Sequence, residues 1–347
     1  MSHPDYGVLS RLLHHLVLGN GLVGRTAFDI ENSQSSQAPF LTIHAPVFVC
    51  GLARSGSTIL LNALYASGQF RSLIYRDMPF VLASGTWRRI TSSDHKDISQ
   101  KERAHGDRIM INFDSPEAFE EIFWRTFIGP QYIGAKTLSV HEVPKPIRKR
   151  FARFVAHVMM SSENPAGLRY LSKNNNNILR IPTLKKIFPD AIILLPFRAP
   201  LQQAISLLQQ HNLWCDEHQK DTFSKRYMEW LGHYEFGLGH KPFQFDNSAI
   251  EWPTKNINYW LQIWFNAYQY ALTVCATEVN FLCYEQLCQQ NITLFKHLSE
   301  LVKLSPEQKN MQKFYQPAPI RSIDGTDANL LYRCESLYQQ LCDASKI

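Results

Sequence analysis

A serine- and glycine-rich turn is the first stretch of this sequence that could do chemistry. It reads GLARSGST over residues 51–58, follows the apolar run 46–50 and leads into a helix-patterned segment over 57–67. Backbone N–H groups in such a turn, facing a helix N-terminus, can hold an anion. The spacing nearly completes the nucleotide-binding motif GxxxxGK[ST], but Ser57 stands where the lysine belongs. The positive charge is Arg54, so we expect a smaller terminal anion than a triphosphate. The alternative is a turn that only caps a helix.

A second candidate anion site follows residues 191–197, a continuous apolar run typical of a strand buried on both faces. Arg198 comes directly after it, and Ser206 lies eight residues further on, in a helix-patterned segment. The carboxyl end of a parallel strand is where α/β sheets bind ligands, and a guanidinium there can bind a phosphate through two hydrogen bonds. The alternative is a strand-exit arginine with a serine that faces the core.

The two motifs together resemble those of the sulfotransferases. The first resembles the loop that binds the 5′-phosphosulfate end of 3′-phosphoadenosine 5′-phosphosulfate (PAPS), and the second resembles the site for the 3′-phosphate of this nucleotide. A Tyr-Glu-x-Leu segment at 284–287 resembles a third family motif, whose tyrosine approaches the nucleotide. The resemblance implies these cofactor-binding residues: Arg54, Ser55, Gly56, Ser57, Thr58, Arg198, Ser206 and Tyr284.

This resemblance covers residues 44–295 and is closer to the protein-tyrosine and bacterial sulfotransferases than to the cytosolic phenol-type branch. It implies an α/β fold: a P-loop-like, three-layer domain with a central parallel sheet flanked by helices. One departure is Ala199, where the family often has an acid. The loss removes a local partner for Arg198 and should not abolish phosphate binding.

The chain shows no repeat or linker that would divide it, so we predict a single domain over residues 1–347. Residues 1–40 are predicted to form a helix and a loop, and the aromatic-rich segment 214–256 a lid. Ser115-Pro116-Glu117 has the composition of a helix start. The loop 313–326 is similar in position to the basic C-terminal loop that closes over the nucleotide in this family, and the resemblance implies that Lys313 or Arg321 does so.

Sulfuryl transfer resembles phosphoryl transfer, an in-line displacement in which positioning and charge stabilisation do most of the catalysis. A cation must meet the charge that builds on the bridging oxygen of the leaving nucleotide, and Arg54 and Lys173 are the candidates. No redox step is needed, and we expect no metal.

A base must also take the proton of the acceptor hydroxyl. The resemblance offers two candidates: Asp77, in a stretch over 72–79 that we predict to be extended, and His105. We favour Asp77, because the stretch 74–79 can return beside the reactive sulfur, whereas His105 depends on a long polar segment folding back. The structural alternatives are an ion pair between Asp77 and Arg76, and a surface histidine.

Composition excludes other classes. The net charge of +6 comes from scattered residues, which suits an anionic ligand better than a nucleic-acid surface. No apolar run reaches the roughly 18–20 residues of a membrane span, and the N-terminus does not read as a signal peptide. Seven cysteines without a CxxC pair indicate free thiols and a cytoplasmic location.

Two other functions stay open from the sequence. One is a P-loop kinase or nucleotidase, against which the missing lysine counts. The other is a non-catalytic nucleotide-binding scaffold, against which the retained Arg54, Arg198 and Ser206 count. The acceptor hydroxyl could belong to a sugar, a peptide tyrosine, a lipid or a phenol.

Overall fold

The computed structural model describes residues 8–34, 41–91, 101–102, 110–245, 250–289, 292–305 and 320–345. Within them, a five-stranded sheet has the order β2-β6-β1-β7-β9, and every neighbouring pair is parallel. The strands are β1 (Val47–Val49), β2 (Phe70–Arg71), β6 (Arg169–Lys173), β7 (Ile192–Phe197) and β9 (Asn280–Cys283). The two strands predicted at 46–50 and 191–197 are neighbours, since Val47 pairs with Ile192.

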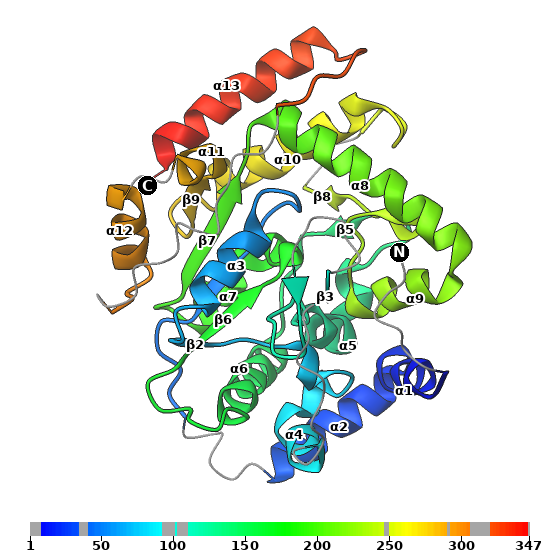
Figure 1. Ribbon diagram of the computed structural model, residues 1–347, viewed down its shortest axis with the longest axis vertical. Coiled ribbons are helices and arrows are strands. Elements are labelled where there is room, and N and C mark those ends of the chain that lie inside the picture. The colour runs from blue at the N-terminus through cyan, green and yellow to red at the C-terminus, as the bar shows by residue number, and fades with distance from the viewer. Residues whose placement is uncertain are drawn as a thin grey trace.

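Helices cover both faces of this sheet (Figure 1). Alternate residues of β1 point to opposite faces, because Val47 and Val49 belong to one buried cluster and Phe48 to the other. On the first face lie α3 (Ser57–Tyr65), α11 (Tyr284–Cys288) and α12 (Ile292–Leu301). On the second lie α5 (Glu121–Tyr132), α6 (Lys145–Met160), α7 (Ile181–Ile187), α8 (Pro200–Lys220), α10 (Ile257–Val274) and α13 (Ala328–Ala344). The predicted three-layer α/β fold is confirmed.

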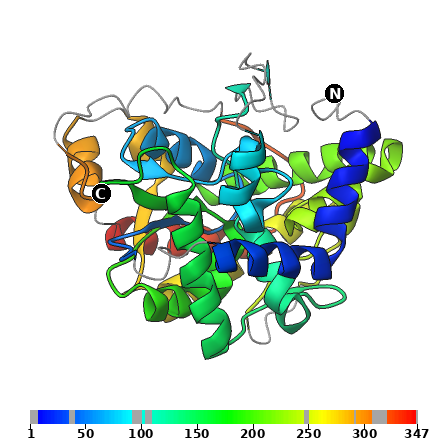
Figure 2. The same cartoon turned by 90° about the horizontal axis from the view of Figure 1, so that it is seen from below.

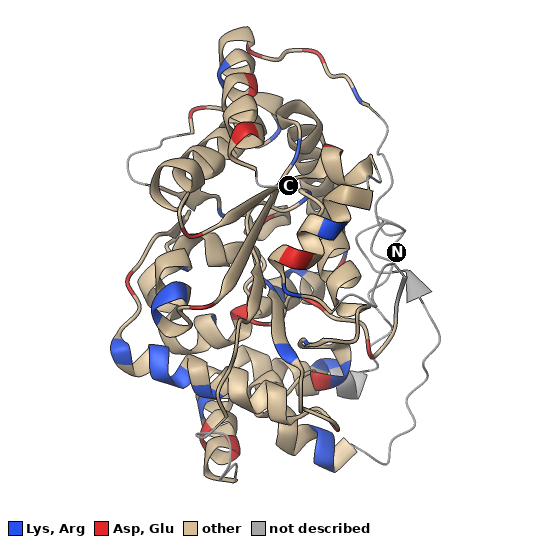
Figure 3. Ribbon diagram, turned by 90° about the vertical axis from the view of Figure 1, so that its left-hand side faces the viewer, with Lys and Arg blue, Asp and Glu red and all other residues tan. Residues whose placement is uncertain are grey.

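The remaining elements surround this core. Helices α1 (Val8–Gly19), α2 (Gly21–Gln34) and α4 (Ser84–Thr91) lie together at the bottom of Figure 1, with α9 (Thr222–Leu231) above α1. Figure 2 shows α1, in dark blue, on the side where the N-terminus lies. Two small sheets pair β3 (Lys101–Glu102) with β4 (Met110–Ile111), and β5 (Leu138–Ser139) with β8 (Phe243–Gln244). Basic and acidic residues occur on several helices (Figure 3), as the mild net charge of +6 leads one to expect. None of the described helices combines the length and apolarity needed to cross a membrane.

Two local predictions need correction. Helix α5 begins at Glu121, and not at Ser115-Pro116-Glu117. Pro116 instead forms a bridge with Ile74, and the Glu117 N–H donates to Leu73 O at 3.0 Å. The stretch predicted to be extended over 72–79 contains a short 3-10 helix, Tyr75–Asp77. Tertiary pairing between these two segments outweighs the local helix-start signal.

The aromatic segment 214–256 packs largely into the core. Its buried rings are Trp214, Tyr227, Trp230, Tyr234, Phe236, Phe243 and Phe245. They belong to the same cluster as the second face of the sheet. Closure of this segment over a nucleotide stays a prediction.

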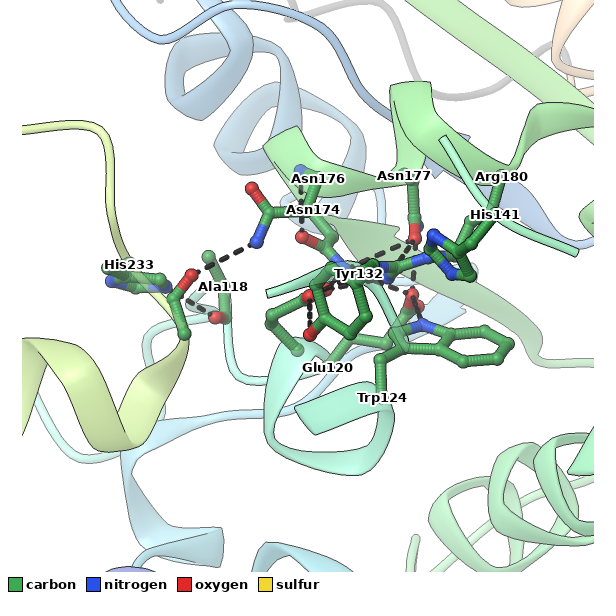
Figure 4. Close-up of polar contacts among 12 residues, drawn as sticks. Ala118, Glu120, Trp124, Tyr132, His141, Asn174, Asn176, Asn177, Arg180 and His233 are labelled. Carbon is green, nitrogen blue, oxygen red and sulfur yellow. Dashed lines mark hydrogen bonds and ion pairs between the residues drawn. The ribbon is translucent and has the colours of Figure 1, made fainter. Parts of the chain in front are cut away.

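A buried polar network lies below the carboxyl end of β6 (Figure 4). Arg180 forms an ion pair with Glu121 at 2.7 Å, and both side chains are almost completely buried. Asn174 donates to the same carboxylate at 2.7 Å, and Tyr132 also donates to it. Burial acts to raise the pKa of Glu121, but the charge and hydrogen bonds of Arg180, with those of Tyr132 and Asn174, outweigh it and lower that pKa. The network fixes the turn that directly follows Lys173.

We expect Arg180→Leu to reduce the free energy of unfolding by ~3–5 kcal/mol, because it leaves the carboxylate of Glu121 buried without its partner. Urea unfolding followed by circular dichroism measures the change. Because the fold lowers the pKa of Glu121, the contribution is present above the ordinary pKa of 4.5 and is lost as the pH falls through the lowered value. The difference between variant and wild type should therefore shrink in acid.

The control is Lys296→Ala, which breaks an exposed ion pair with Glu300 on α12. It should change the free energy of unfolding by less than about 0.5 kcal/mol. Equal and small changes in both variants would contradict the importance given to the buried pair.

Candidate active site

Four strand ends bring the predicted phosphate-binding residues to one edge of the sheet. The serine-rich loop leaves β1, Lys173 ends β6, Arg198 follows β7, and Tyr284 follows β9. The chain leaves β1 toward β2 on one side of the sheet, and it leaves the neighbouring β7 toward β9 on the other side. Such a switch point is where open α/β sheets bind ligands.

The loop after β1 has the geometry of an anion cradle. Arg54 and Gly56 both have left-handed backbone, with φ of 65° and 90°. The Ser55 hydroxyl donates to Leu52 O at 2.9 Å and closes the turn. Helix α3 starts at Ser57, so its first N–H groups have no carbonyl one turn earlier and face outward from the helix. These N–H groups and the helix dipole favour a bound anion at this point.

The two predicted anion sites are in direct contact. Arg54 Nε donates to the Ser206 hydroxyl at 3.0 Å, which joins the loop to helix α8. Gln203, on the same helix, donates to Ala53 O at 2.9 Å. Residues 152 positions apart in the chain thus form one surface.

Arg198 has an environment that suits a phosphate. Its Nε is buried and makes no hydrogen bond to any residue that the structure describes, although the carboxylate of Glu285 lies 3.9 Å away. The guanidinium lies over the ring of Tyr284, 5.1 Å from its centre. Tyr284 in turn lies against Gly56, where a Cβ would come within 2.6 Å of the ring. Tyr284 therefore links Arg198 to the predicted phosphate loop, residues 51–58.

A cavity of about 50 Å³ opens beside the loop and joins predicted and unpredicted residues. The predicted ones that line it are Arg54, Ser57, Thr58 and Lys173, and the others include Glu117, Asn175, His233 and Glu235. Glu117 is held in place, since the Tyr75 hydroxyl donates to Oε2 and the Ala118 N–H to Oε1, both at 2.9 Å. Its signal in the sequence is the same Pro-Glu pair that predicts a helix start.

The structure does not support Asp77 as the base. Its side chain is fully buried and does not line that cavity. Its Oδ2 accepts from Arg71 Nη2 at 2.8 Å and from the Ile74 N–H at 2.9 Å, and Arg88 Nε lies 3.8 Å from Oδ1. Arg76, the partner expected from the sequence, pairs with Asp114 instead. Asp77 therefore has the environment of a structural ion pair.

Three further candidates are His105 in the polar segment, and Lys313 and Arg321 in the C-terminal loop. His105 and Lys313 are outside the described residues, so their roles stay predictions. Arg321 is exposed, and its backbone N–H and C=O both bond to Gln202 of α8, at 2.9 and 2.8 Å. This contact brings the loop around 321 to the helix that carries Ser206.

A larger cleft, of about 910 Å³, lies along the second half of α8 and contains none of the predicted cofactor residues. His211, His240 and Tyr259 are among the residues that line it. Burial lowers the pKa of His211 to about 4, and burial with the neighbouring His211 lowers the pKa of His240 to about 3. Both imidazoles are therefore neutral near pH 7. The chemistry of the smaller cavity, and not the size of this cleft, locates the candidate active site.

A model of the sulfotransferase family matches residues 46–244, more than half of the 347-residue chain. The chain belongs to the sulfotransferase family. Two solved structures resemble this sulfotransferase along nearly its whole length. Sulfotransferase STF9 from Mycobacterium avium has a TM-score of 0.53 and 12% identity, and the match covers 100% of this chain and 88% of that one. Sulfotransferase STF1 from Mycobacterium tuberculosis H37Rv has a TM-score of 0.52 and 13% identity, with 98% and 88% covered.

At these identities the two structures show the fold alone, whereas the family match identifies the activity class. The predicted transfer of a sulfuryl group is confirmed at that level. Among curated proteins no match to the chain is found. The family match ends at residue 244, so Tyr284 and helix α13 lie beyond it.

We expect Gly56→Ala in this sulfotransferase to abolish binding of 3′-phosphoadenosine 5′-phosphate. The substitution places a Cβ at a φ of 90° and 2.6 Å from the Tyr284 ring, so the loop or the ring must move. Isothermal titration calorimetry measures the affinity.

Gly68→Ala is a matched control on the other side of α3. Its φ is 72°, and among the described residues no atom beyond its two chain neighbours lies within 4 Å of the added Cβ. It should lower the free energy of unfolding by ~1–2 kcal/mol through backbone strain alone and leave the affinity unchanged. If both variants bind as wild type does, the loop is not the anion cradle.

Proposed function

We propose that this sulfotransferase takes its sulfuryl group from PAPS and transfers it in line to a hydroxyl of an acceptor. The contact between Arg54 and Ser206 is the observation that carries the proposal. It joins a loop suited to the 5′-phosphosulfate with a separate arginine–serine pair suited to the 3′-phosphate. A nucleotide with phosphates at both positions matches this pair of sites better than ATP does.

The residues present fit this nucleotide. The buried Nε of Arg198, which has no hydrogen-bond acceptor within the described part of the chain, suits a phosphate oxygen. The backbone N–H groups from Ser55 to Thr58 would hold the 5′-phosphate. Bound PAPS would supply an activated sulfuryl group, and Arg54 and Lys173 would stabilise charge on the oxygen that leaves. These groups provide the positive field, so the proposal requires no divalent metal.

We assign the role of base to Glu117 in place of Asp77. Glu117 lines the same cavity as Arg54 and Lys173, whereas Asp77 does not. A carboxylate held by two hydrogen bonds has a fixed orientation, which a general base needs. His105 stays the alternative. The class of the acceptor stays open.

A cytoplasmic location is part of the proposal. None of the seven cysteines, all of which lie in described segments, is in a disulfide, and five of them are buried. Free thiols persist in reducing compartments, where disulfides are rare.

The binding proposal predicts that Arg198→Ala weakens 3′-phosphoadenosine 5′-phosphate by roughly 10- to 100-fold. The reason is the loss of charged hydrogen bonds worth ~1.5–3 kcal/mol. 5′-AMP, which lacks the 3′-phosphate, is the control ligand, and its affinity should stay within about twofold. Calorimetry measures both. Equal affinity of the wild type for the two ligands would contradict the proposal.

The proposal on the base predicts that Glu117→Gln lowers turnover by ~10²–10⁴-fold and leaves nucleotide affinity unchanged. Transfer from PAPS to a panel of phenols, sugars and tyrosine peptides measures turnover, with release of sulfate to water as the reference. Asp77→Asn should instead lower stability, because it weakens the ion pair with Arg71. A folded but inactive Asp77→Asn with a normal Glu117→Gln would restore Asp77. An inactive His105→Ala with a normal Glu117→Gln would favour the histidine.

A further inference from the structure

The start of helix α8 is tied to a residue far along the chain. The N–H of Ala199 donates to Glu285 Oε1 at 3.0 Å, across 86 positions of sequence. Ala199 occupies the position where an acid would resemble the family more closely, next to the arginine. Glu285, on α11, brings a carboxylate to this place instead, and its Oε1 lies 3.9 Å from Arg198 Nε.

The C-terminal helix fixes Glu285 from its other side. The Tyr338 hydroxyl, on α13, donates to Glu285 Oε2 at 3.2 Å. Burial raises the pKa of Tyr338, so its hydroxyl stays protonated and remains a donor. The Tyr338 ring also packs edge-on against Phe197, the last residue of β7, at 5.6 Å between centres. Helix α13 therefore contacts both the strand before Arg198 and the carboxylate that holds the residue after it.

The hydrogen bond at Ala199 holds the residue from which α8 begins. Pro200 has no N–H, so the Ala199 N–H is the last backbone donor before α8. Gln203 N donates to Ala199 O at 2.9 Å, which continues the helix from that residue. The position of Ala199 thus sets both Arg198, just before it, and Ser206, two turns into the helix.

We propose that Glu285, supported by Tyr338, is a positioning residue for the 3′-phosphate site of this sulfotransferase. The inference rests on the proposed binding of the 3′-phosphate by Arg198 and Ser206. The negative charge of Glu285 does not favour a phosphate nearby, so its contribution is that of a hydrogen-bond acceptor. The amide oxygen of a glutamine can accept from the Ala199 N–H. Its amide nitrogen can donate to the Tyr338 hydroxyl oxygen, which keeps that contact with the direction of the hydrogen bond reversed.

The test compares Glu285→Ala with Glu285→Gln by calorimetry, using 3′-phosphoadenosine 5′-phosphate and 5′-AMP. Glu285→Ala should weaken the bisphosphate by ~10-fold and 5′-AMP by less than about twofold. Glu285→Gln should bind the bisphosphate as tightly as wild type or more tightly. Tyr338→Phe, a smaller change, should weaken the bisphosphate by ~3-fold and serves if the alanine variant does not fold.

The outcomes separate this inference from the function on which it rests. A wild type that binds both nucleotides equally overturns the proposed 3′-phosphate site, and the role of Glu285 with it. A wild type that prefers the bisphosphate, with Glu285→Ala or Tyr338→Phe equally selective, overturns the positioning role alone. Equal weakening of both nucleotides also overturns it, since that result indicates general damage to the fold. If Glu285→Gln binds the bisphosphate as weakly as Glu285→Ala does, the charge of Glu285, and not its hydrogen bond, is required.

Discussion

A buried ion pair between Glu121 and Arg180 lies next to the edge of the sheet that carries the candidate active site. Asn174 connects it to the site, since its side chain donates to Glu121 and its N–H donates to Val49 O at 2.9 Å. The ends of β6 and β1, which carry Lys173 and the phosphate loop, are therefore fixed to the same buried carboxylate. Desolvating two charges costs free energy that a hydrophobic pair would not. The polar network, however, gives the two strand ends a defined orientation, which apolar packing alone specifies less well.

Charge inside the small cavity is balanced. The cavity of about 50 Å³ is lined by the cations Arg54 and Lys173 and by the carboxylates Glu117 and Glu235. A site with only cations would bind the donor but would offer no group to accept a proton. Arg54 reaches this cavity from left-handed backbone, which costs about 1 kcal/mol, and its hydrogen bond to Ser206 offsets part of that strain. The loop thus has a conformation that suits an anion.

The phosphate loop, the strand before it and the arginine after β7 could be predicted, because each depends on local pattern and on parallel strands ending at one edge. Glu117 could not, since Pro116-Glu117 carries the ordinary signal of a helix start and only its pairing with the segment 73–74 turns it toward the cavity. The place of Glu285 also depends on contacts across 86 residues, which no local pattern contains. Local sequence patterns predict loops and strand ends well, but they predict poorly which side chains contact one another in the folded chain.

Asp77 and Glu117 show why this is so. They lie on segments that pair with each other, and Tyr75 links the two by donating to Glu117. Asp77 is enclosed between Arg71 and Arg88, so its charge is matched and hidden from any acceptor. The Tyr75 hydroxyl and the Ala118 N–H orient Glu117, and its side chain borders the cavity, where the proposed function places the acceptor hydroxyl. Two acids on paired segments therefore lie in different environments, one enclosed by arginines and one beside the cavity, because tertiary structure gives them different neighbours.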